Sequence, residues 1–304
     1  MICIGPHVSI AGGVQTAPQR AIELGATAFG LFTRNQRQWA SKPLEPEEIA
    51  AFAFGLEKSG INARHAVIHA SYLINIGNPD AEKRRKSLYG LLDECRRAEQ
   101  LGLALVNFHP GSGMGDLAEE ETISLIAEGC RWTLERTTSA VLVLEATAGQ
   151  GSHVGHRFAH LGEIIRRAGS PRRMGVCIDS CHVFAAGYDV RNAEAYARTM
   201  DEFEREVGFD RLVAIHLNDS KSELGSRKDR HDLIGQGTIG LEGLANFVRD
   251  PRLAEIPFVL ETPDPDRWQE EIELLRRVAA SGMPDADGMP GETRRRKEDA
   301  LWGD

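Results

Sequence analysis

The sequence repeats one pattern eight times, in which a short apolar run is followed by a segment with helical periodicity. Runs that are apolar nearly throughout are typical of parallel strands buried on both faces. Eight strand-and-helix units most often close into a barrel, so the sequence predicts an α/β fold of the (β/α)₈ TIM-barrel type. The predicted strands are residues 2–9, 28–33, 65–72, 103–110, 140–147, 174–182, 211–219 and 257–263.

The helical segments carry recognisable start and stop signals. In residues 80–101, Asp80 can cap the first turn, apolar residues recur at intervals of three and four, and Gly102 follows the last turn. Similar segments that precede a glycine are residues 16–24, 157–168 and 193–206. A doubly wound open sheet is the alternative architecture, but no GxGxxG follows the first strand.

Length and composition suit a single barrel. A (β/α)₈ barrel takes about 250 residues, and this chain has 304. We expect one domain over residues 1–280, and residues 281–304, rich in Gly, Pro, Asp and Arg, are expected to form a flexible charged tail. No run approaches the ~18 apolar residues of a membrane span, and no secretory signal opens the chain. We therefore expect a cytoplasmic monomer with no membrane partner.

Two further features limit the class of site. The five cysteines form no CxxC pair, so we expect small buried residues rather than disulfides or a thiolate cluster. The formal charge of −9 argues against a nucleic-acid partner. Three bound divalent cations would offset six of those charges and concentrate positive charge in one cleft. Net charge therefore does not decide between the classes.

Six of the predicted strands end in a side chain that can bind a metal. Neighbouring members of this set are 34 to 45 residues apart, which is one strand-and-helix unit each time. The C-terminal ends of barrel strands meet on one face, where the active sites of such barrels lie. The six residues are His69, His109, Glu145, Asp179, His216 and Glu261.

Three more candidate ligands follow the sixth and seventh strands. His182 lies three residues after Asp179, while Asp229 and His231 lie two residues apart in a long loop. The total of five histidines and four carboxylates is enough for three ions if carboxylates bridge. Imidazole and carboxylate without thiolate suit zinc, with manganese or iron as substitutes.

The other histidines have simpler explanations. His65 begins the third strand, at the end of the barrel opposite the active face. We expect His153, His156 and His160 to face solvent or to cap a helix. For His7, at the end of the first strand, a structural role and a supporting role beside the metal ligands both stay open.

Nine stretches spread over residues 2–280 resemble the endonuclease IV family of apurinic/apyrimidinic endonucleases. The stretches are HVSIAGG (7–13), FTRNQRQW (32–39), IHASYLINIG (68–77), VNFHPGS (106–112), LEATAGQGS (144–152), CIDSCHVFAAGYD (177–189), HLNDSK (216–221), GSRKDRHDLIGQGTIG (225–240) and LETP (260–263). The resemblance implies a barrel with three zinc ions that cuts double-stranded DNA on the 5′ side of an abasic site. It implies a 3′-hydroxyl and a 5′-deoxyribose phosphate as products, with 3′-end-cleaning phosphodiesterase activity as well.

The resemblance also implies roles for individual residues. His69 and His109 would hold one ion, and Glu145 would bridge it to a second ion. Asp179, His216 and Glu261 would complete the second site, and His182, Asp229 and His231 would hold the third ion. Glu145 and Glu261 are the candidate catalytic residues. The implied DNA contacts are Arg37, Gln38, Tyr72 and Leu73, and the charge beside Asp229 adds Arg230.

Three positions depart from the residues common in the family. Ala146 replaces Asn, Asp232 replaces His and Gln236 replaces Glu. None of the three matches a ligand, so the departures affect fine tuning of the site rather than its existence.

Two alternatives stay open at the level of the sequence. A sugar isomerase or epimerase of the xylose-isomerase type would use the same barrel with one or two ions, held mainly by carboxylates. A DNA-damage binder without activity would keep the fold, although a degenerate enzyme usually loses some ligands. The number of metal ions bound per chain distinguishes an isomerase from an endonuclease. An incision assay distinguishes a DNA-damage binder from an endonuclease.

Overall fold

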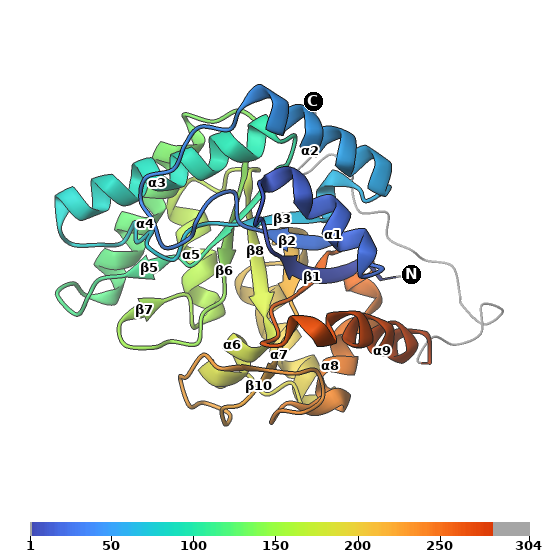
Figure 1. The fold of residues 1–304 in the computed structure, drawn as a ribbon. Helices are drawn as coiled ribbons and strands as arrows, with labels where there is room; N and C mark the ends of the chain where they lie inside the picture. The colour runs from blue at the N-terminus through green and yellow to red at the C-terminus, as the bar shows by residue number, and fades with distance from the viewer. Residues whose placement is uncertain (1, 282–304) are drawn as a thin grey trace.

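The computed structural model describes residues 2–281, so the predicted tail lies, apart from Ser281, outside the described residues. Eight parallel strands form a closed barrel in the order β1-β12-β9-β8-β6-β4-β3-β2 (Figure 1), which confirms the predicted fold class. The barrel strands are β1 (Ile4–Val8), β2 (Phe29–Leu31), β3 (Ala66–His69), β4 (Leu105–Phe108), β6 (Val141–Glu145), β8 (Met174–Asp179), β9 (Leu212–His216) and β12 (Phe258–Leu260).

Helices surround the strands on the outside of the barrel (Figure 1). The α-helices are α1 (Ala17–Glu23), α2 (Pro46–Ser59), α3 (Ala81–Gln100), α4 (Glu119–Leu134), α5 (Phe158–Arg167), α6 (Ser180–Ala186), α7 (Ala193–Glu206), α8 (Gly240–Arg249) and α9 (Trp268–Ala280). The predicted helix cap at Asp80 is present, because its carboxylate accepts hydrogen bonds from the N–H groups of Glu82 and Lys83 at the start of α3. The predicted helix at 193–206 has the same bounds in the structure.

Successive residues of a strand face opposite sides of the barrel wall. In β3, Val67 belongs to a small apolar cluster built from strand residues, while Ile68 belongs to the large cluster shared with the helices. In β4, Leu105 likewise belongs to the small cluster and Val106 to the large one. Because side chains alternate with a period of two, the small cluster fills the interior of the barrel and the large one packs the helices onto it.

Glycine occupies the interior position of the short strand β2. A Cβ at Gly30 would lie 2.7 Å from His7 Cδ2 and 2.8 Å from Val259 Cγ1. These approaches are too close for any larger residue, so Gly30 leaves the space that the His7 imidazole fills. The ring of His7 in turn packs on Phe32, with centroids 4.5 Å apart.

Two small antiparallel ladders lie in the segments that follow the barrel strands. They join β5 (Gly111–Ser112) to β7 (His153–Val154) and β10 (Asp219–Ser220) to β11 (His231–Asp232). In Figure 1, β10 lies beside α6, just past the arrowhead of β8. The second ladder brings His231 back toward the end of β9.

Two expectations about the whole chain can be compared with the described residues. All five cysteines are free, and four are buried, but Cys3 is partly exposed because it precedes the first strand at the surface. Among residues 2–281, no helix has both the length and the apolar character that a bilayer crossing requires.

Candidate metal centre

The candidate ligands at the strand ends are in phase with the interior of the barrel. His69 lies two residues after the interior residue Val67, and Glu145 lies two residues after Val143. The same spacing relates Asp179 to Cys177, His216 to Ala214 and Glu261 to Val259. Because the pleat has a period of two, each of these side chains projects inward at the C-terminal mouth of the barrel.

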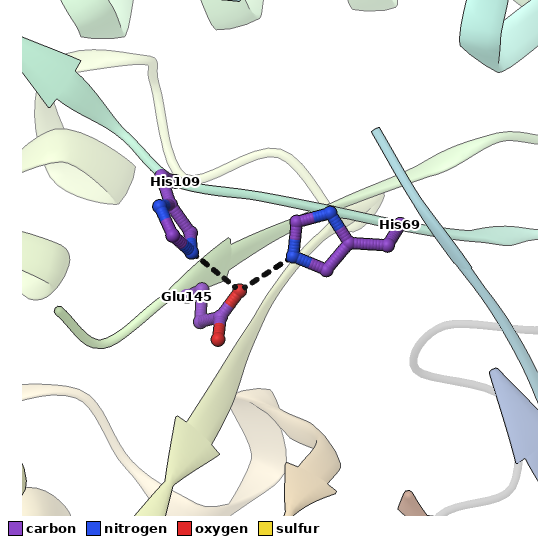
Figure 2. A group of neighbouring side chains, drawn as sticks. All are labelled: His69, His109 and Glu145. Carbon is purple, nitrogen blue, oxygen red and sulfur yellow. Dashed lines mark ion pairs between the residues drawn. The ribbon is translucent and has the colours of Figure 1, made fainter. Parts of the chain in front are cut away.

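The first group contains His69, His109 and Glu145 (Figure 2). Oε2 of Glu145 lies 3.2 Å from His69 Nε2 and 3.3 Å from His109 Nε2. In Figure 2 both imidazoles point toward the carboxylate from different strand ends. Such a triad presents two nitrogens and an oxygen to one point, which is the ligand chemistry of zinc.

Glu145 also belongs to the central group, with Asp179, His216 and Glu261. Its Oε1 lies 3.1 Å from His216 Nδ1, and Glu261 Oε2 lies 3.4 Å from the same nitrogen. The candidate ligand atoms of this group all lie within 4.8 Å of one another. A carboxylate with one oxygen in each of two groups has the geometry of a bridging ligand.

The third group contains His182, Asp229 and His231. His182 Nε2 lies 3.1 Å from Asp229 Oδ2, and His231 Nε2 lies 3.3 Å from Asp229 Oδ1. His182 lies on α6, Asp229 lies in the loop between β10 and β11, and His231 begins β11. The loop is tied to α6, because the N–H groups of Gly225 and Arg227 donate to the carbonyls of Phe184 and Ala185.

The hydrogen bonds of the imidazoles favour metal binding. Nδ1 of His69 lies 2.7 Å from the Ala70 carbonyl, that of His182 lies 3.0 Å from the Ala146 carbonyl, and that of His231 lies 3.1 Å from the Glu261 carbonyl. A carbonyl only accepts, so each Nδ1 carries the proton and each Nε2 presents a lone pair to the cluster. The buried Nε2 atoms of His182 and His231 make no hydrogen bond. The residues therefore fit a site for divalent cations.

The charges of the cluster lead to the same conclusion. Burial raises the pKa of Glu145, but His216 and His109 outweigh it and hold that pKa well below its usual value. Burial is likewise outweighed at Glu261, where His216 and His69 lower the pKa to about 2. For His182, burial lowers the pKa, but Asp179 and Asp229 raise it well above 6.5. The carboxylates are ionised and attract positive charge, which a metal ion or protonated imidazoles can supply.

Two buried asparagines support the carboxylates and were missed at the level of the sequence. Asn107 Nδ2 donates to Glu145 Oε2 over 2.6 Å, and Asn218 Nδ2 donates to Asp179 Oδ2 over 2.7 Å. Both side chains are fully buried. A signal was present, since each asparagine lies within two residues of a predicted ligand, His109 or His216, at the end of an apolar run.

The candidate DNA contacts lie in three loops. Arg37 and Gln38, after β2, are exposed, as is Arg230. Tyr72, after β3, is 56% exposed, and its ring centroid lies 4.9 Å from that of His69. Leu73 is half-buried. Tyr72 therefore borders the first group and still faces solvent.

The remaining histidines are divided between the mouth of the barrel and its periphery. His7 lies beside the ligands, with its ring 6.3 Å from that of His69 and its Nε2 buried without a partner. His65 directly precedes β3, as expected. His153 is exposed and His156 is half-buried.

The expectation for His160 was wrong, because its side chain is only 3% exposed on the inner face of α5. With His156 and Glu119 it forms another cluster of possible ligands. The N–H of Gly155 donates to His160 Nδ1. The N–H of Arg157 Nε donates to His160 Nε2 over 2.6 Å and brings a positive charge beside the ring. Both features oppose binding of a cation there.

The three positions that depart from the residues common in the family belong to none of these ligand groups. Ala146 contributes its carbonyl to His182 and is buried. Asp232 pairs with Asp219 in the ladder of β10 and β11 and lies 4.0 Å from Lys221 Nζ. Gln236 is exposed.

Comparison with known proteins identifies relatives that extend over most of the chain. A family model described as xylose isomerase-like TIM barrel matches residues 18–278. A probable endonuclease 4 of Chlorobium phaeovibrioides is 52% identical over 272 residues, which is 90% of this chain and 98% of the relative. The crystal structure of endonuclease IV from Thermus thermophilus superposes with a TM-score of 0.81 at 39% identity, covering 91% of this chain and 99% of that chain.

A sugar epimerase shares the fold at much lower identity. D-psicose 3-epimerase from Clostridium cellulolyticum gives a TM-score of 0.62 at 11% identity, covering 91% of this chain and 98% of that chain. This likeness shows only that the two chains share the barrel architecture.

Proposed function

Because this chain belongs to the endonuclease IV family within the xylose isomerase-like TIM barrels, we propose that it is a zinc-dependent endonuclease for abasic sites in double-stranded DNA. Membership of the family makes it a DNA-cleaving hydrolase. The proposed reaction hydrolyses the phosphodiester on the 5′ side of the abasic site, leaving a 3′-hydroxyl and a 5′-deoxyribose phosphate. The proposal includes cleaning of blocked 3′ ends, and a monomeric enzyme in the cytoplasm.

The observation that carries the proposal is the meeting of five imidazoles and four carboxylates at one mouth of the barrel. His69 and His109 would hold one zinc ion, Glu145 would be shared, and Asp179, His216 and Glu261 would complete the second site. His182, Asp229 and His231 would hold the third ion. When bound, zinc supplies Lewis-acid chemistry, which makes hydroxide available near neutral pH and neutralises charge on a phosphate. Manganese or iron could replace zinc.

Two carboxylates are the proposed catalytic residues. The Glu261 side chain is 14% exposed, and the low pKa of this carboxyl keeps it ionised, so it can accept a hydrogen bond from the attacking water. Glu145 is fully buried and links the first group to the central group, so it keeps both at a fixed separation. Neither role requires a serine or cysteine nucleophile.

The loops around the mouth are proposed to select the substrate. An abasic site lacks a base in the stack, and side chains of the Arg37–Gln38 and Tyr72–Leu73 loops can occupy the gap. The exposure of Tyr72 beside the first group supports this role. Arg230 is exposed and directly follows the candidate ligand Asp229, so we propose that it contacts a backbone phosphate of the DNA.

The direct test is incision of a duplex that carries a single tetrahydrofuran abasic analogue, resolved on a denaturing gel. We expect one nick 5′ to the analogue, no nick in the intact duplex, and loss of the product with chelator. Binding without a nick would favour a non-catalytic damage binder. Fewer than two tightly bound ions per chain, with no incision, would favour the isomerase alternative.

A further inference from the structure

Asn218 extends the contact between two barrel strands past the end of β9. That strand ends at His216, and the Leu217 N–H still donates to the Val259 carbonyl over 2.9 Å. Asn218 Oδ1 then accepts the N–H of Glu261 over 2.8 Å. The side-chain amide therefore takes the place of a backbone carbonyl and fixes the point from which the Glu261 side chain projects.

The other end of the same amide fixes a second candidate ligand. Asn218 Nδ2 donates to Asp179 Oδ2 over 2.7 Å. The second oxygen of Asp179 accepts the N–H of His182 over 2.9 Å and thereby caps α6. With both oxygens engaged, the Asp179 carboxylate has one orientation, and it caps the first turn of α6, which carries His182.

Asn218 is itself held rigidly. Its backbone N–H donates to Ser180 Oγ over 2.8 Å, and the Ser180 hydroxyl donates to the Asn218 carbonyl over 2.6 Å. The residue is fully buried, and all four of its polar groups have partners at the ends of β8 and β12 or at the start of α6. An amide suits this position, because it offers a donor and an acceptor on two separate atoms and can bind Asp179 with one and Glu261 with the other.

We propose that Asn218 is a positioning residue that sets Asp179 and Glu261 in the geometry needed for metal binding, and that through Asp179 it also sets His182. Residues that orient metal ligands typically change metal affinity by about 10–100-fold when removed. The inference rests on the proposed metal centre and goes beyond its nine candidate ligands. It predicts that Asn218, which is not itself a ligand, sets the metal affinity of the central and third groups. The metal affinity of the first group should not depend on it.

The test is a titration of chelator-treated, full-length protein with Co²⁺ alone, followed by its d–d absorption. Asn218→Ala is compared with the unaltered protein and with Asn246→Ala. Asn246 is a matched control, since its side-chain amide also donates a hydrogen bond, in this case to the Val190 carbonyl over 3.2 Å, but from α8 outside the centre. We expect Asn218→Ala to weaken at least one class of Co²⁺ sites by about tenfold or more and to change the absorption spectrum.

Thermal unfolding of the chelator-treated proteins shows whether Asn218 orients the candidate ligands or is needed for the barrel to fold. We expect Asn218→Ala to fold and to bind Co²⁺ abnormally, and Asn246→Ala to match the unaltered protein in affinity and spectrum. If Asn218→Ala does not fold, Asn218→Asp serves instead, since it retains an oxygen for the Glu261 N–H and replaces the donor to Asp179 with a second carboxylate oxygen. A changed spectrum is expected there as well.

Three outcomes decide the matter. Unchanged affinity and spectrum in the Asn218 variants would overturn the positioning role. Failure of both variants to fold would mean that the residue serves the barrel itself, which overturns it equally. If the unaltered protein binds no Co²⁺, the proposed metal centre fails, and that failure is distinct from the other two.

Discussion

Glu145 connects two of the three candidate ligand groups through its two carboxylate oxygens. Replacing it with alanine removes a ligand from both groups and leaves His69, His109 and His216 without their shared anion. We expect Glu145→Ala to lose at least one zinc ion per chain and to reduce kcat for abasic-site incision by at least about 100-fold, the scale of losing one transition-state contact. Elemental analysis and single-turnover incision measure the two effects. Near-native incision at full zinc occupancy would exclude the bridging role.

His160 makes the stability of the protein depend on pH in the mildly acidic range. Burial is the main cause that lowers its pKa from 6.5 to about 4 in the folded protein, with smaller contributions of both signs from Glu119 and Arg157. Below pH 6.5 the unfolded chain therefore takes up a proton that the folded chain does not. The stabilisation is complete above pH 6.5 and falls as the pH drops toward 4, by up to about 1.4 kcal/mol per pH unit.

Urea unfolding at several pH values between about 4 and 7.5 tests this, with His160→Gln as the comparison. We expect the free energy of unfolding of the variant to fall less steeply below pH 6.5 than that of the unaltered protein. Parallel curves for the two proteins would show that His160 does not contribute to the acid sensitivity.

Single residues also show where sequence reasoning succeeds and where it stops. Histidines and acids at the ends of apolar runs could be identified because strand ends of a barrel converge. Asn107 and Asn218 were not identified, because their closeness in sequence to a predicted ligand does not show which carboxylate they support until the fold brings Glu145 and Asp179 beside them. His160 follows a glycine-rich loop in sequence, and only the packing of α5 shows that its ring is buried.

At the scale of elements, α3 holds the loop that carries Arg37 and Gln38. Glu94 of α3, 1% exposed, accepts hydrogen bonds from Thr33 Oγ1 over 2.6 Å and from Arg34 Nε over 2.7 Å. We expect Glu94→Gln to leave the buried Arg34 charge with the half-exposed Asp93 as its remaining anionic partner, and to lower the free energy of unfolding by about 3 kcal/mol. Because the loop would loosen, KM for abasic DNA should rise more than kcat falls, with metal content unchanged.

Asp93→Asn provides a matched control for this variant. Asp93 carries the same charge, lies next to Glu94 and contacts Arg34 at 3.3 Å, but its side chain is 45% exposed. Because solvent screens the half-exposed Asp93 carboxylate in its contacts with Arg34 and Arg97, the control should lose less stability than Glu94→Gln and keep a nearly native KM. Equal effects of the two substitutions would show that the buried pair has no special role in holding the loop.

The elements of the barrel could be predicted, but their limits and some short elements could not. Every observed barrel strand lies inside a predicted run, although each is shorter, because apolar character continues past the last ladder hydrogen bond. The ladders of β5 with β7 and of β10 with β11 have two residues per strand, too few for a periodic pattern. The seven residues of α6 follow β8 without a break, so the sequence reads as one apolar run.

For the molecule as a whole, the proposed ions would cross-link six strand ends around the mouth of the barrel. Ligands that bind only the folded state stabilise it by mass action, by about 2.7 kcal/mol at about a hundred times Kd. For a chain of this size we therefore expect chelation to lower Tm by at least about 5 °C and zinc to restore it. Scanning calorimetry of untreated, chelated and zinc-restored protein measures the shift. A Tm that is indifferent to chelator would contradict structural cross-linking by metal.

The order in which the chain is synthesised gives the last barrel strand a further importance. β12 pairs with β1 on one side and with β9 on the other, so Ile4 finds its partner Phe258 only after more than 250 further residues have been made. Glu261 follows that strand directly. A growing polypeptide still attached to the ribosome therefore lacks both the closing strand and one candidate ligand of the central group. The central group of candidate ligands can therefore be complete only after the closing strand of the barrel has been synthesised.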